Sequence, residues 1–179
     1  MKRAVFSLSL SLTLVFAAMG QRGLPPSQGI GNFGKINESL YRGAQPDEAG
    51  IKNLKALGVK TIINLRLSQE VVKAEEIEAR SQGIVYTNIP LAGMGRPTQA
   101  EMTNILSLIA TLPAPVFVHC QHGCDRTGTV IACYRIQHDR WSGEEALREA
   151  EKYGISPLER GMRQYVMDFA RSSGKREKK

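Results

Sequence analysis

Short apolar runs alternate with longer amphipathic segments along most of this chain. Strands are expected within 32–42 and over 59–65, 84–91 and 116–119, where apolar residues follow one another closely. Between and after these runs, apolar residues recur at the spacing of one helix face. Helices are therefore expected over 47–57, 68–82, 98–112, 127–138, 143–153 and 157–172. Strands that alternate with helices predict an α/β fold in three layers, with a mostly parallel central sheet flanked by helices.

The first 31 residues have a different pattern. Two basic residues precede an apolar stretch over 4–16, and small residues at positions 18 and 20 suit cleavage before Gln21. Residues 1–20 are therefore predicted to be a signal peptide, with an uncleaved anchor or a half-buried strand as alternatives. Export to a bacterial periplasm follows, without stable membrane insertion after cleavage. Residues 21–31 hold three glycines and two prolines, which predicts a flexible leader.

Composition and charge favour one domain, over 32–170. A length of 179 residues with 42% hydrophobic residues is enough for a full core. The net charge of +7 is concentrated at the two ends, and only about +1 belongs to residues 21–170, so no nucleic-acid surface is expected. The basic tail over 171–179 is predicted to be disordered, with weak attraction to anionic lipid as the alternative. A monomer is expected.

The run His-Cys-Gln-His-Gly-Cys-Asp-Arg-Thr-Gly, over 119–128, sits between a predicted buried strand and a predicted helix. A tight loop at this place can turn backbone N–H groups inward and form an anion site, to which the helix N-terminus adds its positive dipole. Gly123 permits a backbone angle that a side chain resists, and Arg126 offers a fork that matches phosphate oxygens. In this field Cys120 is expected to react as a thiolate nucleophile.

The remaining residues of the run have supporting roles. The phosphate is expected to bind the segment formed by Gln121, His122, Gly123, Cys124, Asp125 and Arg126. Thr127 is predicted to hydrogen-bond the sulfur, and His119 to orient the loop from behind. A zinc site is not expected, because the histidines and cysteines of the run lie within six residues, whereas zinc ligand pairs come from separate segments.

The run matches the Cys-x5-Arg-Ser/Thr signature and so resembles the cysteine-dependent protein tyrosine phosphatase superfamily, in its dual-specificity branch of bacterial and fungal type. The phrases Ser-Leu-Tyr-Arg-Gly-Ala-Gln-Pro, at 39–46, and Ile-Ile-Asn-Leu-Arg, at 62–66, extend the resemblance over about 32–170. It implies a phosphatase without metal or cofactor that acts through a phosphocysteine. Its partners would be phosphorylated proteins, with phosphotyrosine and also phosphoserine or phosphothreonine, or small phosphomonoesters. The alternatives are an inositol phosphate or phosphoinositide phosphatase and a non-catalytic phosphate-binding module.

The general acid is where this chain departs from the resemblance. Related enzymes take an aspartate from a loop about 30 residues before the cysteine, yet residues 89–98 hold no Asp or Glu. Glu101 follows, where capping of a helix is the favoured role. Asp125, inside the phosphate loop, is the candidate acid. The alternative is a structural carboxylate bonded to loop amides or to a neighbouring arginine, and His122 is a further donor to consider.

Other side chains keep two interpretations. Cys124 either forms a reversible disulfide with Cys120 or fills space, and Cys133 is expected to be a small buried hydrophobe. Four more polar residues are candidates for the pocket or for the scaffold: Arg42, Gln45, Arg66 and Arg96. Arg42 and Gln45 would line the rim unless Gln45 only forms a turn. Arg66 would pair with a carboxylate behind the loop, and Arg96 would meet an anionic substrate unless it is simply solvated.

Overall fold

The structure, a computed structural model, describes residues 23–67 and 69–176. Its strands are β1 Gly34–Asn37, β2 Leu40–Gly43, β3 Thr61–Asn64, β4 Val85–Asn88 and β5 Val116–His119. Its helices are α1 Glu48–Ala56, α2 Gln69–Ser81, α3 Gln99–Thr111, α4 Asp125–His138, α5 Gly143–Lys152 and α6 Arg160–Arg176.

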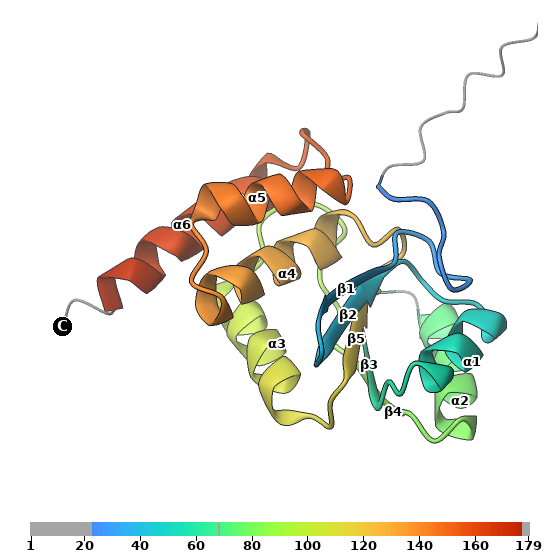
Figure 1. The fold of residues 1–179 in the computed structure, drawn as a ribbon. Coiled ribbons are helices and arrows are strands. Elements are labelled where there is room, and N and C mark those ends of the chain that lie inside the picture. The colour runs from blue at the N-terminus through green and yellow to red at the C-terminus, as the bar shows by residue number, and fades with distance from the viewer. Residues whose placement is uncertain (1–22, 68, 177–179) are drawn as a thin grey trace, which may run out of the picture.

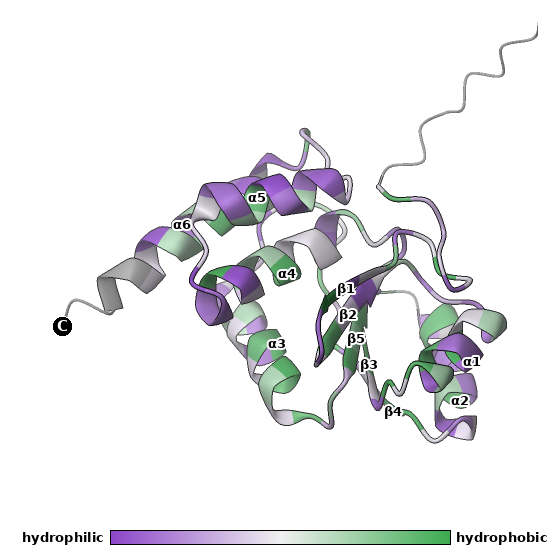
Figure 2. Cartoon of the chain, in the orientation of Figure 1, coloured by the Kyte–Doolittle hydropathy of each residue, from purple (hydrophilic) through white to green (hydrophobic). Residues whose placement is uncertain are grey.

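The strands form one sheet in the order β1-β2-β5-β3-β4, in which β2, β5, β3 and β4 run parallel. Helices α1 and α2 cover one face and α3 to α6 lie on the other (Figure 1). The three-layer α/β prediction is therefore confirmed. Because both faces are covered, side chains alternate between two cores along each strand: Val116 and Val118 pack toward α3 and α4, and Phe117 packs toward α1 and α2. Figure 2 accordingly shows that most residues of the central strands are hydrophobic.

The single strand predicted within 32–42 is wrong. The segment forms two strands, and β1 pairs with β2 antiparallel, so the sheet is mixed at this edge. The reason is a tight turn, in which the backbone N–H of Ser39 donates to the side-chain oxygen of Asn37 at 2.9 Å. Asparagine favours turns through this local bond, which competes with continuation of the strand.

Two helices, α4 and α6, differ from the prediction by more than one residue at an end. Helix α4 begins at Asp125 rather than at residue 127, which puts an acidic side chain in its first turn, where the helix dipole stabilises it. Helix α6 begins at Arg160 rather than at residue 157, because the Ser156 hydroxyl accepts from the N–H of Leu158 at 3.2 Å and holds a turn there. It continues to Arg176, so the segment 171–179, predicted to be disordered, begins inside a helix.

Residues 23–31, predicted as a flexible leader, instead pack against the domain. Ile30 is fully buried in the core between α1 and the sheet. The N–H of Ala44 donates to the Gly31 carbonyl at 2.7 Å, and Asn53 donates to the Gln28 carbonyl at 2.9 Å. Two apolar residues six positions apart, Leu24 and Ile30, give no periodic signal among glycines and prolines, so the sequence pattern missed this contact. The predicted signal peptide, 1–20, lies outside the described residues.

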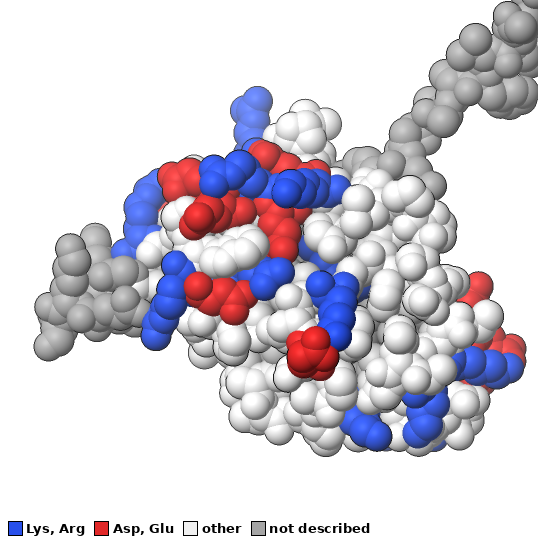
Figure 3. Space-filling view, viewed as in Figure 1, with Lys and Arg blue, Asp and Glu red and all other residues white. Residues whose placement is uncertain are grey.

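The outer surface over α5 carries both signs of charge. On the face shown in Figure 3, acidic and basic side chains lie side by side over α4 and α5. Arg135 of α4, for example, pairs with Glu149 of α5 at 2.7 Å. No helix within the described part of the chain is long and apolar enough to cross a membrane.

Candidate active site

Cys120 lies directly after β5, and the loop 120–124 joins this strand to the N-terminus of α4. Its side chain is almost buried, at 3% exposure. Gly123 has a φ of +68°, and a Cβ there would lie 2.5 Å from the carbonyl carbon of Gly43. Glycine is therefore required both by the backbone conformation and by the close approach of β2. The loop thus leads directly into the first turn of α4, where backbone N–H groups without partners inside the helix can bind an anion.

Arg126 follows in the first turn of α4. Its guanidinium donates from Nη1 to the Leu65 carbonyl at 3.2 Å, which brings the side chain to the end of β3. Within the described residues it forms no ion pair. The charge of this fork is thus available to a phosphate held by the loop.

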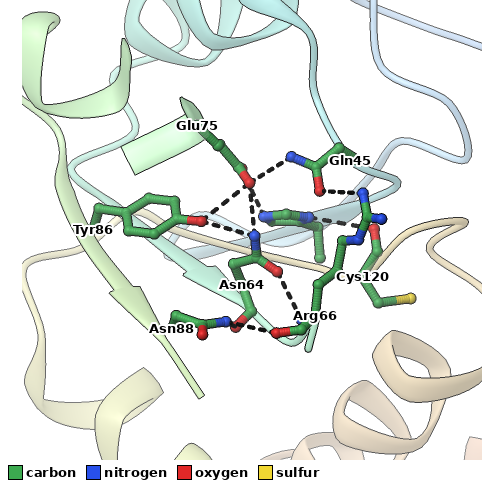
Figure 4. Close-up of polar contacts among 8 residues, drawn as sticks. Gln45, Asn64, Arg66, Glu75, Tyr86, Asn88 and Cys120 are labelled. Atoms are coloured by element: carbon green, nitrogen blue, oxygen red, sulfur yellow. Dashed lines mark hydrogen bonds and ion pairs between the residues drawn. The ribbon is translucent and has the colours of Figure 1, made fainter. Parts of the chain in front are cut away.

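A buried polar network supports the loop from behind (Figure 4). His119 places Nδ1 3.3 Å from the Cys120 carbonyl oxygen and Nε2 2.8 Å from Oε1 of Glu75. The other carboxylate oxygen of Glu75 accepts from three side chains, those of Gln45, Asn64 and Tyr86. Burial, together with the nearby Glu75 carboxylate, raises the pKa of Tyr86 above its usual range, so this phenol stays a donor. Sequence reasoning missed Glu75, which was one of several acidic residues on a charged helix.

Arg42 lies beneath the loop and not at the pocket rim, so the rim interpretation of this residue is wrong. It is fully buried, donates from Nη2 to the Gly123 carbonyl, and places its guanidinium carbon 3.8 Å from the centre of the Tyr153 ring. Burial lowers the pKa of Arg42 to about 10, so the side chain remains charged at neutral pH. The charge therefore acts on the loop from inside the protein.

Asn32 is a second residue that the sequence did not single out. It is buried, has a φ of +53°, and its side-chain nitrogen donates to the carbonyls of His122 at 3.3 Å and Tyr153 at 2.8 Å. Its side-chain oxygen accepts from the N–H of Leu24 at 2.8 Å. Asparagine tolerates the left-handed conformation better than other polar residues, which was the available signal. Asn32 thereby joins the N-terminal segment to the catalytic loop.

The other residues of the run are divided between the surface and the core. Gln121 and His122 are exposed. Cys124 is buried, and its thiol donates to the His122 carbonyl at 3.3 Å. Thr127 is buried too, but its hydroxyl forms no hydrogen bond with any residue that the structure describes, so the predicted bond to the Cys120 sulfur is not made. Cys133 is buried as predicted, and burial raises the pKa of its thiol.

Asp125 contacts a loop of the neighbouring helices. Its Oδ1 accepts from the backbone N–H of Ser156 at 2.7 Å, and its carbonyl accepts from the Thr129 hydroxyl at 2.8 Å. The residue is half-buried at the start of α4. The side chain of Asp125 thus connects the start of α4 to the turn between α5 and α6. This geometry favours the structural interpretation of Asp125.

The loop over 92–97 contacts α6 through an ion pair and leads into α3, whose start is capped. Arg96 pairs with Asp168 at 2.7 Å, which occupies the side chain that was a candidate for an anionic substrate. The N–H of Gly95 donates to Glu159 at 3.2 Å. Glu101 forms a capping box with Thr98, as predicted, and these hydrogen bonds hold the pKa of Glu101 below its usual 4.5.

Comparison with known proteins agrees with this arrangement. The family model described as DSP-PTPase phosphatase fused to NAD+ kinase matches residues 27–167. Dual specificity protein phosphatase TpbA of Pseudomonas aeruginosa is 30% identical over 132 residues, which are 69% of this chain and 55% of TpbA. An inositol diphosphatase of Arabidopsis thaliana is 25% identical over 143 residues, which are 76% of this chain and 69% of the relative.

The fold has the same likeness. The crystal structure of P. aeruginosa TpbA in complex with phosphotyrosine superposes with a TM-score of 0.70 at 23% identity, covering 88% of this chain and 98% of that one. At this sequence identity, the structural similarity shows a shared fold and no more. The chain spans 55% of the length of the curated TpbA, so the activity of the whole relative is not transferred by the match.

Proposed function

Because the chain belongs to the dual-specificity-like cysteine phosphatases, we propose that it hydrolyses phosphomonoesters through a phosphocysteine intermediate. The proposed substrates are phosphotyrosine and also phosphoserine or phosphothreonine in proteins. The observation that carries the proposal is the segment 120–126. Cys120 lies at its start, Gly123 forms its turn, and Arg126, which has no ion pair among the residues that the structure describes, lies at its end.

The reaction proceeds in two displacements at phosphorus. The Cys120 thiolate attacks the phosphate, an S–P bond forms, and the bond between phosphorus and the leaving oxygen breaks. Loop amides, the α4 N-terminus and Arg126 stabilise the charge on the equatorial oxygens. The leaving oxygen takes up a proton. Water then attacks the phosphocysteine, which releases inorganic phosphate and restores the thiolate.

The substrate class has two candidates. A phosphorylated protein as the substrate is supported by the dual-specificity name of TpbA and by the phosphotyrosine bound in its crystal structure. The alternative, an inositol phosphate substrate, is supported by relatives named inositol diphosphatases. Against it, Gln121, His122 and Cys124 occupy the variable loop positions, where a polyphosphate would favour basic residues.

Trapping of the intermediate tests the proposal. The full chain is mixed with p-nitrophenyl phosphate, quenched within one turnover, and analysed by mass spectrometry for a phosphoryl group on Cys120. We expect one phosphoryl group on the wild type and none on Cys120→Ser. Absence of both the adduct and product release would leave a phosphate-binding module instead. A panel of phosphotyrosine peptide, phosphoserine peptide and inositol phosphates then ranks the substrates.

A further inference from the structure

Arg66 carries a positive charge beside the catalytic loop. It lies in the turn after β3 and is half-exposed. Its guanidinium donates from Nη1 to the side-chain oxygen of Gln45 at 3.1 Å. Among residues 23–67 and 69–176 it has no carboxylate partner. Arg96 and Arg135, in contrast, pair with acidic side chains. Arg66 was expected to find a carboxylate behind the loop, and it finds a neutral amide.

The orientation of this amide is set by the buried network. Gln45 donates from Nε2 to the Glu75 carboxylate, which only accepts hydrogen bonds when ionised. The oxygen of the amide must therefore face the other way, toward Arg66. The carboxylate of Glu75 faces other groups: one oxygen lies 2.8 Å from Nε2 of His119, and the other accepts from three donors. The guanidinium is thus held in place without losing its charge.

The position of Arg66 relates it directly to the phosphate loop. The backbone N–H of Gln45 donates to the Gln121 carbonyl at 3.3 Å, so the partner of Arg66 is bound to the loop. The carbonyl of Leu65, the residue before Arg66, accepts from Arg126. Figure 4 shows the Arg66 side chain extending from the end of β3 toward Gln45 and the main chain of Cys120. Arg66 and Arg126, neither of which has a carboxylate partner in the described part of the chain, therefore flank the same loop.

We propose that Arg66 forms a second anion subsite, which binds another phosphoryl or carboxylate group of the same substrate next to the scissile phosphate. The proposal rests on the proposed function of the loop and narrows its substrate class to compounds with two neighbouring anionic groups. One edge of the guanidinium is used by Gln45, and the rest of the planar fork is suited to an anion. A carboxylate in place of Gln45 would cancel this charge, whereas the amide orients it.

The kinetic test compares substrates with one and two anionic groups. The substrates are p-nitrophenyl phosphate, an inositol bisphosphate, and phosphotyrosine peptides flanked by glutamate or by alanine. We compare kcat/KM for each substrate with two anionic groups, the inositol bisphosphate and the glutamate-flanked peptide, with kcat/KM for p-nitrophenyl phosphate. For Arg66→Gln we expect this ratio to fall about tenfold for the substrate that uses the subsite, as loss of one charge-assisted pair implies. Arg66→Lys should recover part of the ratio. Arg148→Gln, an exposed arginine of α5, is the matched control and should leave the ratio as it is.

The two sources of the second anion give different results. A fall confined to the inositol bisphosphate identifies a phosphoryl group on a small molecule, and a fall confined to the glutamate-flanked peptide identifies a protein carboxylate. The proposal is overturned when Arg66→Gln lowers kcat/KM equally for every substrate. It is also overturned when the wild type favours neither substrate with two anionic groups over p-nitrophenyl phosphate.

A binding measurement separates this subsite from the activity of the loop. Inorganic phosphate and pyrophosphate are titrated into Cys120→Ser by calorimetry, with and without Arg66→Gln. We expect pyrophosphate to bind more tightly than phosphate and to lose that advantage in the double variant. If the wild type hydrolyses no phosphomonoester but this binding pattern is found, the proposed function is wrong and the subsite stands. If pyrophosphate binds Cys120→Ser and the double variant with equal affinity, the subsite is wrong.

Discussion

At the scale of single residues, Arg42 is the charge that supports the loop from within. It donates to the Gly123 carbonyl and stacks on Tyr153, and it is fully buried. Arg42→Met removes a buried cation that interacts electrostatically with Cys120. We expect kcat/KM for p-nitrophenyl phosphate at neutral pH to fall about tenfold, because the loop loses this charge beside the bound phosphate.

Arg42→Lys is the comparison for this prediction. It keeps the charge but not the planar stack, so kcat/KM should stay closer to that of the wild type. Circular dichroism checks that both variants fold. An unchanged kcat/KM in folded Arg42→Met would limit Arg42 to a packing role.

Asp125 is tested by its effect on the leaving group. If it donates the proton, Asp125→Asn should slow hydrolysis of an alkyl phosphate by roughly 10²-fold or more while sparing p-nitrophenyl phosphate, whose leaving group needs little help. If it only holds the Ser156 amide, both substrates should slow alike and the urea midpoint should fall. The contact with Ser156 favours the second pattern. Steady-state kinetics with both substrates, alongside urea unfolding, separates the two.

The residues that sequence reasoning found differ from those it missed by the range of their contacts. Cys120 and Arg126 were predictable because their chemistry depends on a strand, a tight loop and a helix start within ten neighbouring positions. Asn32 was not, because it reaches a carbonyl 90 positions away. Glu75 was missed for the same reason, since its partners come from separate strands and loops. Such contacts are set by the topology of the sheet, which local patterns do not encode.

At the level of elements, helix α3 follows the loop 92–97, and its start is held by a capping box between Thr98 and Glu101. Thr98→Ala removes the side-chain cap, so the free energy of unfolding should fall by about 1 kcal/mol in urea at neutral pH. Thr103→Ala makes the same change at an exposed position inside the helix and should cost nothing. A loss of the same size in both variants would contradict the capping role.

The capping effect should also depend on pH. The folded pKa of Glu101 lies below its ordinary 4.5, so its contribution is fully present above that value and is lost as the pH falls through the folded pKa. The stability gap between the wild type and Thr98→Ala should therefore narrow as the pH is lowered past 4.5. It should not vanish, because the Thr98 hydroxyl also accepts from the N–H of Glu101, which does not titrate. Urea unfolding at a series of pH values measures this gap.

Strand and helix types followed from apolar spacing, whereas boundaries depended on side-chain bonds. The buried β3 and β5 were predictable because strands covered on both faces are apolar throughout. The β1–β2 hairpin was not, because one Asn37 side chain decides the turn. The start of α6 likewise depends on the Ser156 hydroxyl. Periodicity describes an element, and its ends are set by single hydrogen bonds.

At the scale of the whole molecule, the N-terminal segment connects the predicted export signal with the catalytic loop. We propose that residues 1–20 direct export and are removed before Gln21. The contacts of the domain begin soon after that point: Leu24 donates to Asn32, and Asn32 holds the His122 carbonyl. Cleavage before Gln21 keeps this chain of contacts, while cleavage after Leu24 would break it. The expected mature protein therefore begins at Gln21 and is as active as the full chain or more so.

Expression of the full chain in a bacterium, periplasmic extraction and intact-mass measurement check this. A chain that lacks residues 2–20 is the control and should be missing from the periplasmic extract. Full-length protein that stays with the cell body would contradict the export proposal, and a mature form that begins beyond Leu24 with full activity would contradict the role given to Asn32.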